Sequence, residues 1–200
     1  MNTHLYNDET FAFIIMAAGE SKRLGQPKQL IKHQGDTLLS HQISRCQQIS
    51  AHVYCLLGFK ANEIEQTIKQ NHVNILKNDN WHLGLGSSIA SAISQLPAGI
   101  EGAMIILVDQ WALTVSDLNH LIATWQGDRS SIVVCKSALH NELSPPIIFP
   151  KQHFSALKKL SGEKGAKRVL QANKADTIGV TLENAFYDLD TPEQLENLPK

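Results

Sequence analysis

The sequence predicts an α/β fold: a single-domain, Rossmann-like, doubly wound and mostly parallel sheet. Apolar runs alternate along the chain with segments that have helical spacing. The apolar runs are continuous, as in strands buried on both faces, and FAFIIM (residues 11–16) and AMIILVD (103–109) are examples. A chain of 200 residues that is 42% hydrophobic fills one core. We therefore expect one domain spanning residues 1–200.

The first two thirds of the chain are the most regular. Apolar runs predict buried strands, and apolar spacing of three and four predicts helices between them. Thr114 is placed as the N-cap of the fourth helix. The predicted strands are 11–16, 52–58, 73–78, 103–109 and 130–135, and the predicted helices are 37–49, 61–70, 87–96 and 114–125.

The last third is less regular. SPPIIF (144–149) predicts an edge strand, because proline removes a ladder donor. Thr191, Pro192 and Gln194 have the spacing of a capping box that opens a last helix. The other predicted elements are helices at 154–160 and 165–171 and strands at 177–182 and 185–190.

Composition excludes several classes of function. A formal net charge of -1 without a basic arm argues against nucleic-acid binding. No apolar run is long enough to span a bilayer, and the polar start MNTHLYNDET is unlike a signal peptide. We expect a cytoplasmic protein with no membrane partner. Cys46, Cys55 and Cys135 are odd in number and widely spaced, which favours reduced, buried thiols.

The run MAAGESKRLGQPKQ (16–29) directly follows the first predicted strand, where open parallel sheets bind ligands. Ala17, Ala18 and Gly19 have almost no side chain, so a base or phosphate can approach their amides. Arg23 and Lys28 add positive charge. The alternative is a solvated surface turn with incidental basic residues. Neither the Walker loop nor the dinucleotide-binding glycine pattern matches.

AAGESKRLGQPK resembles the signature AAGxSxRMGxPK of MobA-like nucleotidyltransferases, in particular the molybdenum cofactor cytidylyltransferases similar to MocA. Further segments resemble the family's motifs in the family's order over nearly the whole chain: GLGSSIASAI, VDQW, SPPIIFP, SGEKGAKRVL and YDLDTPEQL. The resemblance implies a nucleotide-diphospho-sugar transferase-like fold and transfer of a nucleoside monophosphate from an NTP to a phosphorylated acceptor, with release of pyrophosphate.

The resemblance also implies roles for individual residues. The catalytic residues would be Arg23, Lys28 and Asp109, with Lys28 the strongest candidate, while Lys22 holds a variable position. The ligands of the implied Mg²⁺ would be Asp109 and one of the pair Asp188 and Asp190, while the other of the pair would serve the turn into the last helix. The nucleotide-binding residues would be Ala17, Ala18, Gly19, Gly58, Gly84, Ser87 and Ser88.

The residues by themselves permit blander readings. Asp109 suits a turn or helix cap, and Ser87 and Ser88 suit N-caps. Asp188 and Asp190 flank Leu189 at strand spacing, which would direct both to one face.

The chain departs from the family pattern at four positions. Trp111 replaces the proline of the DQP turn, where an indole would reshape the acceptor pocket. Ser144 and Pro145 replace a glycine and a polar residue, and Glu163 replaces an aspartate.

Ala18 favours CTP as the nucleotide, since the AAG form of the loop resembles cytidylyl-transferring members. The resemblance implies molybdopterin as the acceptor and a molybdenum hydroxylase as the partner enzyme. Two alternatives are a sugar-phosphate nucleotidyltransferase and a non-catalytic accessory protein that delivers cofactor or nucleotide.

Overall fold

The computed structural model describes residues 8–139 and 142–199. Residues 1–7, part of the N-terminus that bears on the signal-peptide expectation, lie outside this range. The described residues form a seven-stranded sheet in the order β5-β4-β1-β6-β8-β7-β9 and a small β2-β3 hairpin. The strands are β1 (Phe11–Ala17), β2 (Lys32–His33), β3 (Asp36–Thr37), β4 (Val53–Leu57), β5 (Asn74–Lys77), β6 (Gly102–Leu107), β7 (Ile132–Lys136), β8 (Leu143–Pro150) and β9 (Thr177–Thr181).

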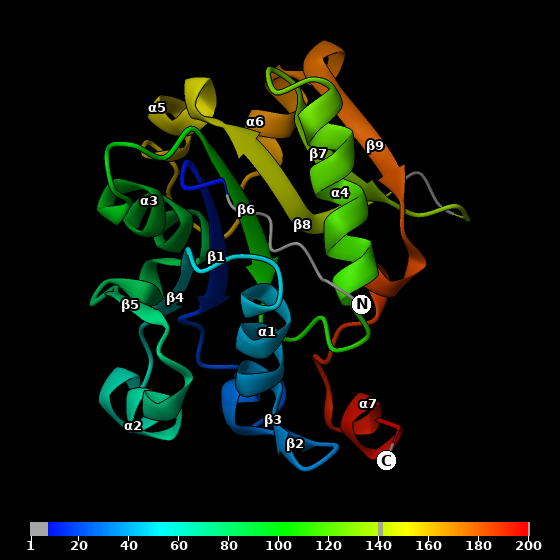
Figure 1. Ribbon diagram of the computed structural model, residues 1–200. Helices are drawn as coiled ribbons and strands as arrows, with labels where there is room; N and C mark the ends of the chain where they lie inside the picture. Colours follow the sequence, from blue (N-terminus) through cyan, green and yellow to red (C-terminus); the bar gives the residue numbers. More distant parts are fainter. Residues whose placement is uncertain (1–7, 140–141, 200) are drawn as a thin grey trace.

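Two helical layers cover the sheet, as expected for a doubly wound fold (Figure 1). Phe13 faces the layer of α1, α2 and α4, and its neighbour Ile14 faces the layer of α3, α5 and α6. The helices are α1 (Leu38–Gln47), α2 (Ala61–Thr67), α3 (Leu85–Gln95), α4 (Val115–Gly127), α5 (Phe154–Leu157), α6 (Lys167–Ala172) and α7 (Pro192–Glu196). Short 3-10 helices lie at Lys28–Leu30, Lys69–Asn71, Trp81–Leu83, Lys151–His153, Lys174–Asp176 and Glu183–Phe186.

The sheet is mostly parallel, which confirms the predicted fold class. Strands β5, β4, β1 and β6 run parallel, and β9 runs parallel to β7. The antiparallel strand is β8, which pairs with both β6 and β7. The carboxyl ends of β1 and β6 therefore lie side by side at one edge of the sheet.

The capping predictions are confirmed at two helices. The Thr114 hydroxyl accepts from the Asp117 amide at 3.1 Å, and the Asp117 carboxylate accepts from the Thr114 amide at 2.8 Å. Thr191 and Gln194 form the same reciprocal pair at the start of α7. Both signals are local, so they do not depend on the rest of the fold.

The prediction that residues 144–149 form an edge strand is wrong, because β8 lies between β6 and β7. Pairing with β6 begins at Ile147, beyond both prolines. On the other side, the register shifts so that Cys135 pairs with Ser144 and Val134 with Ile147. Pro145 and Pro146 thus lie in the irregularity, where no ladder hydrogen bond requires their missing N–H groups.

The strand predicted at 185–190 is also absent. Residues Glu183–Phe186 form a 3-10 helix, and the chain from Tyr187 to Asp190 pairs with no described strand. Leu189 is nonetheless fully buried against Leu24, Ile31 and Leu38. The alternation that suggested a strand instead anchors this segment beneath the loop after β1.

The three cysteines are free and buried, as predicted. Burial raises the pKa of Cys46 to about 12 and that of Cys135 to about 12, and it raises the pKa of Cys55 as well. No helix within the described part of the chain is long and apolar enough to cross a membrane.

Candidate active site

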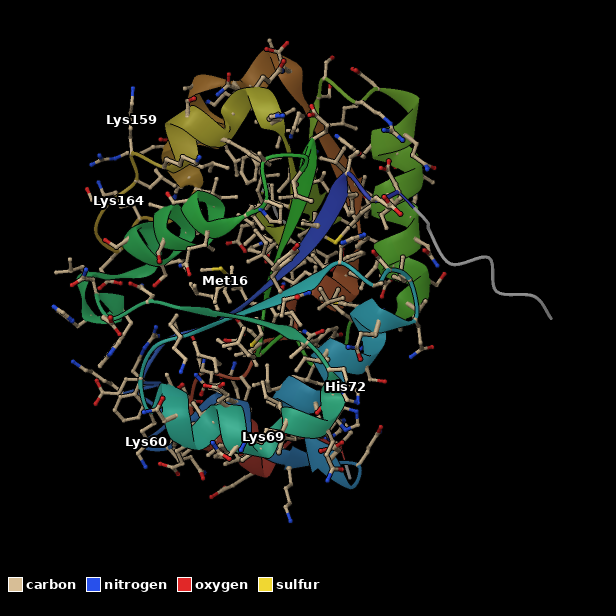
Figure 2. The ribbon with its side chains drawn as sticks, turned by 60° about the vertical axis from the view of Figure 1, so that its left-hand side comes forward. Met16, Lys60, Lys69, His72, Lys159 and Lys164 are labelled. Carbon is tan, nitrogen blue, oxygen red and sulfur yellow. The ribbon has the colours of Figure 1, made fainter. Side chains whose placement is uncertain are left out.

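A cavity of about 470 Å³ opens at the carboxyl ends of β1 and β6. We call it the loop cavity, because the segment after β1 forms much of its wall. In Figure 2, Met16, which lines it, lies between the part of the molecule that carries Lys164 and the part that carries Lys60. The loop cavity is lined by Met16, Ala18, Gly19, Glu20, Ser21, Lys22, Arg23, Lys28, Gln29, Trp81, His82, Gly84, Leu85, Ser88, Leu107, Val108, Asp109, Glu163 and Asp190.

A buried glutamine that sequence reasoning missed fixes the shape of the loop. The Gln29 side-chain amide donates to the carbonyls of Ala17 at 2.7 Å and Gly19 at 2.9 Å. Ala17 itself is buried and does not line the cavity, whereas Ala18 and Gly19 do. No Cβ at Gly19 would meet an atom within 4 Å, so this position faces open space. Gln29 follows Lys28 directly in the sequence, but nothing in its local pattern indicates where its amide points.

Lys28 lies at the centre of the charged groups. Its ammonium donates to Asp109 Oδ2 at 2.6 Å and to Asp190 Oδ1. Arg23 approaches the other oxygen of Asp190 at 3.5 Å, with 78% of its side chain exposed. Three of the predicted catalytic and metal-binding residues thus meet in direct contact, although they come from three distant parts of the chain. Lys22, in contrast, is 80% exposed and pairs with Glu20, at 3.5 Å.

The pKa values of this group follow from burial and its charges. Burial alone would lower the pKa of Lys28, but attraction to Asp109 and hydrogen bonds to Asp109 and Asp190 raise it. Burial would raise the pKa of Asp190, but the hydrogen bond from Lys28 and the attraction of Lys28 and Arg23 lower it. Asp188 has a raised pKa, because burial and then repulsion by Asp109 and Asp190 outweigh attraction to Lys28. At neutral pH the charged forms of Lys28 and Asp190 are favoured.

The metal-ligand prediction can be compared with the donor atoms. Asp109 Oδ1 is buried and has no hydrogen-bond partner among the described residues. A carboxylate oxygen left in this way suits a hard divalent cation. The described residues contain no group of three or more His, Cys, Asp or Glu side chains placed to hold a metal. The reason is visible at Asp109 and Asp190, where the Lys28 ammonium lies between the two carboxylates.

A wall of main-chain atoms closes one side of the loop cavity. The Gly86 amide donates to the Gly162 carbonyl at 2.7 Å. A Cβ on Gly84, whose φ is +98°, would come within 2.7 Å of Gly162, and one on Gly86 within 2.9 Å of its carbonyl. Both glycines are needed because backbone meets backbone here. Glu163, from the same turn, is one of the residues that line the loop cavity.

The N-cap interpretation of Ser87 and Ser88 is wrong. Helix α3 begins at Leu85 with Gly84 as its N-cap, so both serines lie in the first turn. Ser88 lines the loop cavity and accepts from the Asn78 amide at 3.1 Å. Ser87 bonds back to the Leu83 carbonyl at 3.3 Å and does not line the cavity.

Gly58 has an indirect relation to the cavity. It is not one of the lining residues, but a Cβ there would lie 2.5 Å from the Trp81 Cβ and 2.8 Å from the Ala18 carbonyl. Gly58 therefore allows Trp81, which does line the cavity, to pack against the loop.

Trp111 packs among other side chains and does not line the loop cavity. Its ring packs against His33 and Tyr187, with centroids 5.7 and 5.9 Å away, and it lines neither of the two large cavities. The adjacent Gln110 is the residue of this turn that sequence reasoning undervalued. Its side-chain amide donates to the carbonyls of Ala185 at 2.7 Å and Pro145 at 2.5 Å, which ties three chain segments together beside Asp109.

A second cavity, of about 830 Å³, adjoins the first, and Leu85 and Leu107 line both. We call it the lysine cavity. Its aliphatic lining includes Ile105 and Ile147 from the sheet face and Ile89 from α3, which covers that face. The lysines that line it are Lys136, Lys164, Lys167 and Lys174. None of the four forms an ion pair with a carboxylate in the described part of the chain, and one acid, Glu142, shares the lining.

The fold and site together define a nucleotidyltransferase: an open α/β sheet with a small, basic loop and an acidic residue at the carboxyl ends of adjacent parallel strands. Comparison with known proteins agrees. A family model described as the MobA-like NTP transferase domain matches residues 13–177. The chain belongs to this family.

Curated relatives match over most of their length. Purine catabolism protein PucB of Bacillus subtilis is 27% identical over 92% of this chain and 93% of its own. The molybdenum cofactor cytidylyltransferase of Escherichia coli is 26% identical, covering 90% of this chain and 91% of its own. A probable molybdenum cofactor guanylyltransferase of Rhodopirellula baltica is 23% identical, covering 91% and 88%.

Solved structures show the same fold. A homologue of Mycobacterium tuberculosis Rv0371c from Mycobacterium sp. strain JC1 has a TM-score of 0.80 and 30% identity, with 94% of each chain covered. Rv0371c of M. tuberculosis in complex with manganese has a TM-score of 0.77 and 20% identity, covering 94% of this chain and 97% of its own.

Proposed function

We propose that this nucleotidyltransferase moves CMP from CTP to the terminal phosphate of a molybdopterin-type molybdenum cofactor and releases pyrophosphate. The observation that carries the proposal is the meeting of Lys28, Arg23, Asp109 and Asp190 in the loop cavity, beside the small residues Ala18 and Gly19. An acceptor phosphate is already ionised, so the reaction requires alignment and charge neutralisation rather than a general base. Cytidylyltransferase and guanylyltransferase relatives support the class of reaction.

The loop cavity offers a place for each part of the NTP. Ala18 and Gly19 line the cavity with almost no side chain, which suits a base and sugar that lie against the backbone. Lys28 and Arg23 would neutralise the triphosphate and the departing pyrophosphate, which is the kind of electrostatic stabilisation that dominates such reactions. Asp109 and Asp190, with Asp188 nearby, would hold Mg²⁺, which supplies charge neutralisation at the phosphates when bound.

The lysine cavity supports an acceptor with a flat or apolar body and anionic groups. The aliphatic floor suits a ring system, and four lysines without ionic partners suit phosphate and other anions. A sugar phosphate would need hydrogen-bond partners for its hydroxyl groups, and the uncharged polar residues in the lining are Gln171 and Thr177. The balance favours a molybdopterin-type acceptor over a sugar phosphate.

Catalysis is favoured over a purely accessory role. A carrier of cofactor would need the lysine cavity but not the charged group around Lys28. Trp111, which motivated the accessory hypothesis, packs away from both cavities. The enzyme that receives the product would be a molybdenum hydroxylase, as the sequence resemblance implies.

The first test is thermal stabilisation by CTP, GTP and ATP, each with and without Mg²⁺, since a ligand that binds the native state raises the melting temperature. We expect the largest shift with CTP and Mg²⁺. Pyrophosphate release is then measured with molybdopterin-bound molybdenum and with a sugar phosphate as acceptors. Larger stabilisation by another NTP would overturn the base assignment, and no shift with any NTP would overturn the proposed function.

A further inference from the structure

Lys28 occupies an unusual position for a residue expected to bind phosphate. It is 9% exposed, and its ammonium is bonded to two carboxylates, Asp109 and Asp190, rather than directed to open space. In the free protein, therefore, a cation already lies between the two acids that would bind a metal.

The lysine satisfies these acids only in part. Asp109 Oδ1 remains buried without a partner, while Oδ2 accepts from Lys28. Two carboxylates thus face one buried ammonium, and the exposed guanidinium of Arg23 approaches one of them. Negative charge remains available to a second cation once a partner is found for Lys28.

We propose that Lys28 holds the position of the divalent cation in the free protein, and that metal and nucleotide consequently bind together. This inference rests on the proposed function, because it takes the loop cavity as the NTP site. A divalent cation entering alone meets the positive charge of Lys28 at the same carboxylates, so its affinity is weak. The triphosphate gives Lys28 a new anionic partner within the same cavity and frees both acids.

The consequence is reciprocal coupling between the two ligands. If the nucleotide raises the affinity for the metal, the metal raises the affinity for the nucleotide by the same factor. Lys28 is then a positioning residue in the free protein, where it keeps the acids together, and a phosphate-binding residue in the complex. Both roles use the same ammonium, so Lys28 cannot bind the two carboxylates and the phosphates at the same time.

The experiment measures Mn²⁺ binding without nucleotide, by water-proton relaxation. Lys28→Met removes the ammonium and keeps much of the side chain's bulk, and we expect it to bind Mn²⁺ about tenfold or more tightly than the wild type. Lys28→Arg retains the charge and is expected to bind as weakly as the wild type. Lys32→Met, which removes an exposed positive charge outside both cavities, is the control and leaves the affinity unchanged.

Repeating the titration with CTP completes the test. The wild type gains about tenfold or more in Mn²⁺ affinity, and Lys28→Met gains much less, because its carboxylates were already free. If Lys28→Met is poorly folded without metal, a larger rise of its melting temperature with Mn²⁺ than that of the wild type reports the same effect.

Two outcomes would overturn the inference: equal Mn²⁺ affinity of Lys28→Met and the wild type, or wild-type affinity that CTP does not change although CTP binds. Failure of every NTP to bind would instead overturn the proposed function. The titration without nucleotide would still decide the role of Lys28.

Discussion

The two cavities treat charge in opposite ways. In the loop cavity the buried charge is paired internally, since Lys28 bonds to Asp109 and Asp190. In the lysine cavity, Lys136, Lys167 and their neighbours have no ionic partner among the described residues. A paired site must exchange partners when a ligand enters, whereas an unpaired one accepts an anion directly. The difference predicts that metal and nucleotide bind to the loop cavity in a coupled and selective way. In the lysine cavity, the contributions of the individual lysines to anion binding should add.

The largest expected effect is on catalysis. Lys28→Met should lower kcat/KM for nucleotidyl transfer by about 100-fold to 1,000-fold, as when one donor to a developing negative charge is removed. Lys32→Met, which removes an exposed lysine that lines neither cavity, should leave the rate unchanged. The rate is followed by pyrophosphate release under saturating Mg²⁺. A Lys28→Met enzyme with nearly full activity would remove the loop cavity from the reaction.

The next largest effect is expected at the backbone contact between the start of α3 and Gly162. Gly84→Ala places a Cβ against the Gly162 backbone at a φ of +98° and should cost about 1–3 kcal/mol of stability. Gly99→Ala, where no atom lies within 4 Å of the new Cβ, is the control and should be nearly neutral. Urea unfolding measures both variants. Equal stability of the two would show that this backbone contact yields easily.

The lysine cavity should respond more gently. Lys167→Gln should raise the KM for the acceptor about threefold to tenfold, because one partly exposed charge contributes roughly 1 kcal/mol. The thermal shift produced by CTP should not change. Lys69→Gln, which changes an exposed lysine outside this cavity's lining, serves as the control. A change in the CTP shift would contradict the separation of the two cavities.

The smallest effect concerns the sheet that floors the lysine cavity. Val134 lines that cavity, while the adjacent Cys135 points to the opposite core. A thiol reagent at pH 8 should therefore leave the native protein unmodified and react with all three cysteines after denaturation. The raised pKa of Cys46, about 12 in the folded state against 9.0 as its ordinary value, means that the unfolded chain loses its thiol proton first. Stability contributed by the thiols consequently falls as pH rises above about 9.

Those features that depend on neighbouring residues could be predicted from sequence. Thr114 and Thr191 cap their helices through contacts three residues away, and FAFIIM forms a buried strand because all its residues are apolar. The position of the binding loop follows from where that strand ends. Lys28 and Asp109 were identified by motif, and the structure brings them into contact.

The predictions that were wrong concern features that depend on partners distant in the sequence. Nothing within SPPIIF indicates that β7 shifts its register opposite the two prolines. The local pattern therefore predicts an edge strand where the structure has an interior one. The alternation around Leu189 serves a small cluster instead of a sheet. Gln29 and Gln110 act through carbonyls, which every residue has, and so leave no signature in the sequence.

The contact of Gly86 with Gly162 joins the start of α3 to the turn before α6 through main-chain atoms. Such a joint is blind to the side chains of its neighbours, provided that the glycines are kept. Glu163 and Lys164, which face different cavities from this one turn, are free to change in related proteins without loosening the joint. Substitutions in this turn can therefore change the preference for the acceptor in related proteins, while the nucleotide site stays the same.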